Sequence, residues 1–164
     1  MKRAISSFAA LTAVLLLAVS AQASGAGAVS VTQTFHNATQ PLVDSPNPCT
    51  GVLGDGALTY NGVIHMTVLT SGVGAGTGWF TFTAAGDLNI VQDNGVTFTG
   101  HFVMWDGGNG NLHNSTGTST FNIHATGSDG STVDYHAAFH ITVLLTSPTP
   151  TVVVQFMTVR ATCT

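Results

Sequence analysis

The segment that most constrains this fold is 132–145, where apolar and polar side chains alternate without a break. One set would share a face of an extended strand, and the other set would share the opposite face. The first set is Val133, Tyr135, Ala137, Phe139, Ile141 and Val143, and the second is Asp134, His136, Ala138 and His140. This period of two predicts a half-buried β-strand. Almost nothing after residue 23 has a helical pattern, so the expected fold class is all-β.

Further segments rich in Thr, Val and Phe predict about eight strands in an antiparallel meander. We expect them at 28–36, 57–70, 78–84, 87–92, 96–105, 118–126, 132–145 and 151–160. Most connections are short, and the two long ones are 37–56 and 106–117. Eight strands could close into an up-and-down barrel, which removes exposed edges. A two-sheet sandwich is the alternative.

The first 23 residues are typical of a secretory signal peptide. A basic start at Lys2 and Arg3 precedes an apolar stretch, and Ala21-Gln22-Ala23 is a small-x-small cleavage site. We therefore expect a secreted, extracellular domain over 24–164, with no membrane span. That domain would keep Arg160 as its only Lys or Arg, which excludes binding to nucleic acid.

The chain has two cysteines, Cys49 and Cys163. An exported protein meets an oxidising environment, so the favoured interpretation is an intramolecular disulfide. It would connect the Pro-rich segment 37–56 to the last strand. No residue beside either cysteine would activate a thiol for catalysis.

Histidine and aspartate side chains gather on the polar face of the strands near 118–145. A three-residue loop at 128–130 places His124 opposite Asp134, and Asn122 opposite His136. If Trp105 pairs with Thr118, His101 would lie beside Asn122. His124, Asp134 and His136 are then candidate metal ligands, since zinc binds such donors at about 2.0–2.2 Å. The alternative is a solvated sheet face stabilised by cross-strand pairs.

The segment 106–117 is the other candidate for binding, because connecting loops usually display binding groups. Trp105, Asp106, His113 and Asn114 are its candidate ligand-binding residues, and the alternative is a flexible turn anchored by the tryptophan. No catalytic residues are predicted. The chain has no G-x-S-x-G motif, and Asp44, Asp55, Asp87, Asp93 and Asp129 are interpreted as turn formers.

The run "TGHFVMWDGGNGNLHNSTGTSTFNIHATGSDGSTVDYHAAFHI" resembles a family of small secreted actinobacterial β-rich proteins of unknown function. The shared features are a "TGHF…W" strand, a Gly/Asn loop, "GSDGS" before a His-containing strand, and a cysteine near the C-terminus. The resemblance implies export and a β-rich domain, and no activity. Likeness to lipocalin-type or allene-oxide-cyclase-type barrels is architectural only.

Three hypotheses follow for function. The first is non-catalytic binding of a small apolar or amphipathic molecule by a disulfide-closed barrel. The second is a structural or surface-interaction protein that recognises a cell-surface component. The third is a His/Asp metal-binding protein or small enzyme. No cofactor is expected, and the sequence does not determine the oligomeric state.

Overall fold

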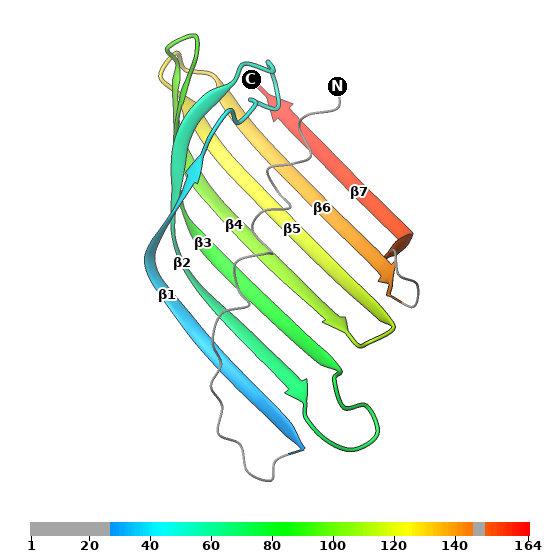
Figure 1. Cartoon of the computed structure of the whole chain (residues 1–164). Helices are drawn as coiled ribbons and strands as arrows, with labels where there is room; N and C mark the ends of the chain where they lie inside the picture. Colours follow the sequence, from blue (N-terminus) through cyan, green and yellow to red (C-terminus); the bar gives the residue numbers. More distant parts are fainter. Residues whose placement is uncertain (1–26, 146–149) are drawn as a thin grey trace.

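The computed structural model describes residues 27–145 and 150–164 of the chain. The predicted signal peptide and its cleavage site, and with them the start of the predicted domain, lie outside these residues. The described part forms seven β-strands (Figure 1). They are β1 (Ala28–Leu42), β2 (Gly54–Leu69), β3 (Gly78–Gln92), β4 (Thr97–Gly110), β5 (Asn114–Gly127), β6 (Thr132–Leu144) and β7 (Thr151–Cys163). Among the described residues no helix is long and apolar enough to cross a membrane.

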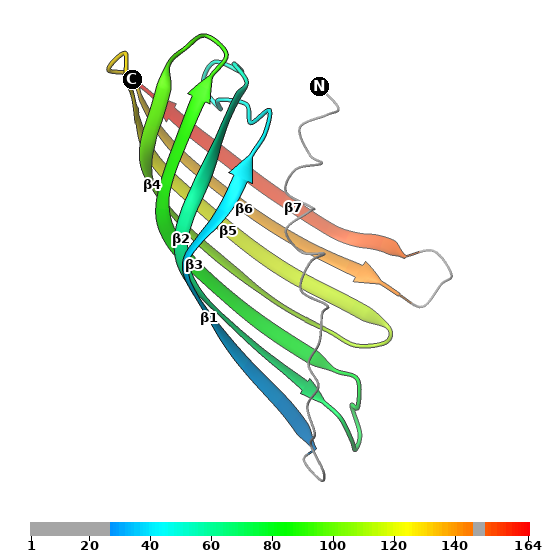
Figure 2. The same cartoon turned by 60° about the vertical axis from the view of Figure 1, so that its left-hand side comes forward.

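All seven strands belong to one antiparallel sheet in the order β1-β2-β3-β4-β5-β6-β7. The predicted all-β meander is confirmed. The alternative of two packed sheets is wrong, because the described chain forms a single sheet. The sheet is strongly curved but does not close (Figures 1 and 2), and β1 and β7 are its two edges. Seven strands place β1 and β7 in the same direction, so closure would need a parallel pair.

The prediction of eight strands fails at residues 85–86, where a break was expected. β3 passes straight through this point, and Gly86 pairs with Tyr60 on one side and Phe102 on the other. A Cβ at Gly86 would collide with the backbone carbonyl of Thr59. The glycine therefore marks a close approach of two strands within the sheet and does not end the strand.

The predicted long loop at 106–117 is also wrong. β4 continues to Gly110 and β5 begins at Asn114, so only residues 111–113 connect them. Asn111 closes this turn, because its side-chain Oδ1 accepts bonds from the backbone N–H groups of His113 (2.8 Å) and Asn114 (3.0 Å). Glycine and asparagine have low strand propensity. Here pairing with neighbouring strands on both sides overrides it.

The core lies on one face of the sheet, which we call the inner face. Its buried apolar side chains are Ile64, Ala84, Leu88, Phe98, Phe102, Phe121, Ala125 and Val133. The outer face carries mainly Thr, Asn, Asp and His. The histidines that have a cross-strand partner in the register have their side chains on this outer face, and they are His65, His101, His124, His136 and His140.

A disulfide joins Cys49, in the β1–β2 connection, to Cys163 at the end of β7, as predicted. Cys49 packs against the inner-face cluster of Leu88, Phe98, Ala125 and Val133. The connection thus reaches from the β1 side of the sheet to the β7 side across the inner face. The inner face is therefore the concave one, and it is covered at this end.

Candidate functional site

The inner face carries a row of aromatic rings that crosses six consecutive strands. The row consists of Phe35, Tyr60, Phe82, Phe102, Phe121 and Tyr135. Six pairs among these rings have centroids 5.6–6.5 Å apart, and all six pairs are tilted or edge to face. This is the distance range at which aromatic pairs attract. Phe102 and Phe121 are buried in the middle of the row, while the other four rings are partly exposed.

Asp106 lies beside this row on the inner face, paired across the sheet with Phe82 of the row and with Ser119. Burial raises the pKa of its carboxyl above the ordinary value, and a hydrogen bond from the Ser119 side chain opposes the rise. Burial likewise raises the pKa of the Tyr135 phenol. The inner face thus combines apolar and aromatic surface with a few polar groups.

The four residues predicted to bind a ligand on a loop are not brought together. Trp105 and Asp106 lie within β4 with their side chains on opposite faces. His113 and Asn114 lie at the β4–β5 turn, about 17–20 Å further along the sheet at the strand rise of about 3.3 Å per residue. The four residues therefore do not share one loop, because 106–110 belong to β4 and place consecutive side chains on alternate faces.

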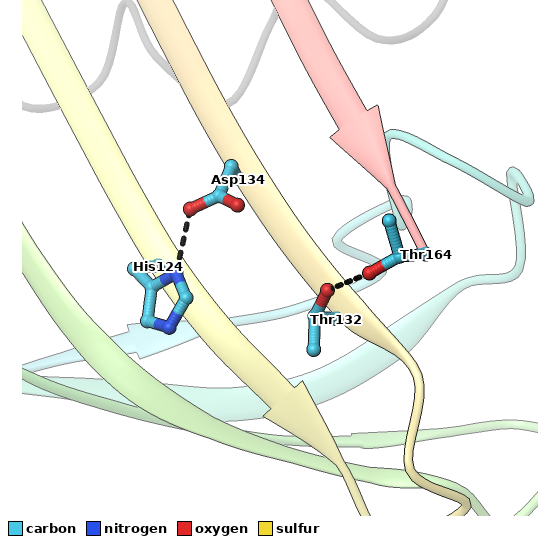
Figure 3. Close-up of polar contacts among 4 residues, drawn as sticks. All are labelled: His124, Thr132, Asp134 and Thr164. Atoms are coloured by element: carbon cyan, nitrogen blue, oxygen red, sulfur yellow. Dashed lines mark hydrogen bonds and ion pairs between the residues drawn. The ribbon is translucent and has the colours of Figure 1, made fainter.

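The outer face holds a row of four ionisable side chains on adjacent strands, with two aspartates outside and two histidines inside. The register pairs Asp87 with His101, His101 with His124, and His124 with Asp134. His101 Nδ1 lies 2.5 Å from Asp87 Oδ1, and His124 Nδ1 lies 2.5 Å from Asp134 Oδ1. Figure 3 shows the second of these contacts, beside the hydrogen bond between Thr132 and Thr164.

One of the two predicted histidine registers is confirmed and the other is wrong. The β5–β6 hairpin places His124 opposite Asp134 and Asn122 opposite His136, as predicted from its turn. β4 pairs Trp105 with Thr120, not with Thr118, so His101 lies opposite His124. Asp87 was interpreted as a turn former, but it lies in the middle of β3. The pairing of Asp87 with His101 was therefore not predicted.

An open groove of about 450 Å³ runs along this part of the outer face, and its lining includes His101, His124, Asp134 and His136. Arg160, the cross-strand partner of His136, also lines it. His136 Nδ1 lies 2.7 Å from the side-chain oxygen of Asn122. A second groove of about 480 Å³, on the β2–β4 side, includes Asp87 and His101. His101 is common to both grooves.

The predicted trio of His124, Asp134 and His136 is close in the sheet, but its donors have separate partners. Asp134 contacts His124, and His136 contacts Asn122. In the described ranges 27–145 and 150–164, no three His, Cys, Asp or Glu side chains form a group able to hold a metal ion. The outer face is thus a chain of paired side chains, of which the His101–His124 pair is central.

No protein-family model, no curated protein and no solved structure matches this chain.

Proposed function

We propose that this chain binds a small apolar or amphipathic molecule against the inner face of its sheet, without catalysis. The observation that carries this proposal is the aromatic row, four of whose six rings are partly exposed on the concave face. Exposed apolar surface of this kind usually marks a binding surface. Within residues 27–145 and 150–164, no element packs over the inner face at the end remote from the disulfide.

Two features favour a small molecule over a protein domain as the occupant. The face is concave, and the loop bonded through Cys49–Cys163 covers one end of it. Small-molecule sites are typically concave and mostly apolar, with a few polar groups that fix orientation. Asp106 and Tyr135 are such groups here, and they favour an amphipathic ligand with a hydrogen-bonding head.

The proposal includes an extracellular site of action and a barrel-like mode of binding. The disulfide supports an oxidising compartment, and the apolar stretch after Lys2 and Arg3 supports export. The resemblance to small secreted actinobacterial proteins agrees with this placement. The curved sheet would act as an incomplete barrel, in which the ligand occupies the space that a closed barrel would fill.

A neutral fluorescent probe, N-phenyl-1-naphthylamine, tests this proposal when it is titrated into the oxidised protein and displaced with decanol. We expect saturable binding that Phe139→Asp weakens about tenfold, because a charge on the inner face opposes an apolar ligand. Ala138→Asp is the matched control, since this neighbour in β6 has its side chain on the outer face. Circular dichroism checks that both variants fold. Absence of saturable binding, or equal weakening by the two variants, would contradict the proposal.

The second candidate function, a surface-interaction protein of the cell envelope, is supported by β7. This strand forms one edge of the sheet, and all but one of its thirteen residues are exposed. Phe156 and Met157 are 57% and 58% exposed, which is unusual for large apolar side chains in a strand. Such an edge suits pairing with another strand.

A further inference from the structure

We infer that His101 and His124 together form a binding site for one divalent transition-metal ion, with Asp87 and Asp134 as the residues that orient them. The site lies on the outer face and is independent of the apolar ligand proposed above. It also differs from the trio predicted from the sequence, because Asp134 orients a ligand here and His101 replaces His136 as the second imidazole.

The two aspartates determine which nitrogen of each imidazole ring carries a proton. An ionised carboxylate only accepts hydrogen bonds, so Nδ1 of each histidine must carry the proton that Asp87 or Asp134 accepts. In a neutral ring, Nε2 then holds a lone pair. Metal-binding histidines in proteins almost always donate their other N–H to a carboxylate or carbonyl in this way. The Asp87–His101 pair and the Asp134–His124 pair therefore each consist of a carboxylate, a histidine and an Nε2 that can bind a metal ion.

The strand register brings the two histidines next to each other. His101 and His124 are direct cross-strand partners on one face, where Cβ atoms lie about 4.5–5.5 Å apart. Gly100 precedes His101, and a Cβ there would collide with the backbone carbonyl of His124, so β4 and β5 approach closely at this level. Nitrogen ligands bind zinc at about 2.0–2.1 Å, and two cross-strand imidazoles can meet this requirement.

The contacts of Nδ1 also limit the direction of Nε2 in each ring. Nδ1 of His101 is directed toward β3 and Nδ1 of His124 toward β6, the two outer strands of the row. Nε2 is separated from Nδ1 by one carbon of the imidazole ring, so each Nε2 is directed away from the aspartate that its own Nδ1 contacts. The two side chains are 81% and 65% exposed, which leaves room for water molecules to complete the coordination.

The chemistry of the donors selects the ion. Imidazole nitrogen suits zinc, copper and nickel, whereas calcium and magnesium prefer oxygen. A site with two protein ligands binds more weakly than a structural zinc site with four. We therefore assign this site to copper or zinc, and we expect it to be a surface site that exchanges its ion.

Calorimetric titration of the untagged, oxidised protein with Zn²⁺ tests the inference, and electron paramagnetic resonance with Cu²⁺ reports the number of bound nitrogens. We expect one ion per chain, two nitrogen ligands, and loss of at least tenfold in affinity in both His101→Ala and His124→Ala. Asp87→Asn and Asp134→Asn should each weaken binding about tenfold, as loss of an orienting carboxylate does in other sites.

Two histidines provide matched controls on the same face. His140 has its Nδ1 2.7 Å from the Thr118 hydroxyl and faces no histidine, so His140→Ala should leave the affinity unchanged. His136→Ala should also leave it unchanged. The inference is overturned if no saturable binding occurs, if His101→Ala binds as well as the parent, or if binding depends on His136 in place of His101. Unchanged affinity in both aspartate variants would overturn the orienting role.

Discussion

At the scale of single residues, Asp106 differs from the other described aspartates because its side chain lies on the apolar inner face. Asp134 and Asp87 lie on the outer face beside histidines, and Asp129 lies in an exposed turn. There, hydrogen bonds from the Ser131 side chain and backbone lower the pKa of the Asp129 carboxyl. Burial has the opposite effect on Asp106 and raises its pKa.

The raised pKa of Asp106 predicts a pH-dependent stability. A carboxyl in the unfolded chain has a pKa of about 4, so between this value and the raised one the folded state binds more protons than the unfolded state. The contribution of Asp106 to the free energy of unfolding is therefore greatest below about pH 4 and is lost as pH rises through the folded-state pKa. Asp106→Asn should be more stable than the parent near pH 7, and this advantage should disappear near pH 4.

Urea unfolding of parent and variant across this pH range measures the effect. Asp93→Asn, which removes a charge from an exposed turn, is the control for the change in net charge. Parallel stability curves for the parent and Asp106→Asn would contradict the assigned burial of the carboxyl.

Individual residues also mark the limit of what the sequence could predict. Cys49 and Cys163 were paired correctly, since only two cysteines are present. Asp87 was not recognised, because an aspartate after a glycine is typical of turns as well as of this strand. Its function depends on lying opposite His101, and no local pattern encodes that partnership. The sequence signal for this partnership is a glycine directly before each of the two residues, in Gly86-Asp87 and Gly100-His101.

At the scale of elements, the β5–β6 hairpin could be predicted because its turn fixes its register. Gly130 has a φ of 87°, and the Gly127 N–H donates to the Ser131 carbonyl at 2.7 Å. The register of β4 against β5 could not be predicted in the same way. A shift by two residues keeps every side chain on its face, so the alternation is equally satisfied by Trp105 opposite Thr118 or Thr120. The length of the turn, which glycine and asparagine obscured, decides between them.

The two edge strands differ in their capacity to pair with another strand. β1 is interrupted by a bulge between Phe35 and Ala38. Pro41, near the end of the same strand, has no N–H to donate. Thr132 and Thr164 exchange two backbone hydrogen bonds, so alternate residues of β7 have their backbone groups directed toward β6. The residues between them, including Met157, Val159 and Ala161, have their N–H and C=O groups directed away from the sheet. β1 is protected from pairing, and β7 is not.

We therefore expect the protein to self-associate through β7 at high concentration, by antiparallel pairing about a two-fold axis near Val159. Val159→Lys should shift the equilibrium toward monomer, because pairing would bring two lysines together across the axis. Val103→Lys is the control, because Val103 is similarly exposed but lies on central strand β4. Sedimentation equilibrium over a range of concentrations measures this. A parent protein that stays monomeric throughout, or equal effects of both lysines, would refute the expectation.

At the scale of the whole molecule, the covalent link compensates for the missing closure of the sheet. Each strand packs chiefly against its neighbours in the sheet, and no described pair of strands joins the two edges. The sequence predicted a barrel because barrels remove edges, but an odd number of strands in a meander disfavours closure by antiparallel pairing. The disulfide instead fixes the β1–β2 connection to the end of β7, across 114 positions of sequence.

Loss of this disulfide should lower the free energy of unfolding by about 4–5 kcal/mol, the loop-entropy value for a separation of this size. It should also expose the cluster of Leu88, Phe98, Ala125 and Val133, since Cys49 would no longer be held against it. Urea unfolding with and without dithiothreitol measures the first effect, and hydrogen exchange of the four cluster amides measures the second. The Cys49→Ser/Cys163→Ser variant should match the reduced protein and be insensitive to the reductant. If reduction leaves the midpoint of unfolding and the exchange rates unchanged, the curved sheet is held by its strand pairing alone, and the concave face does not depend on the covalent link.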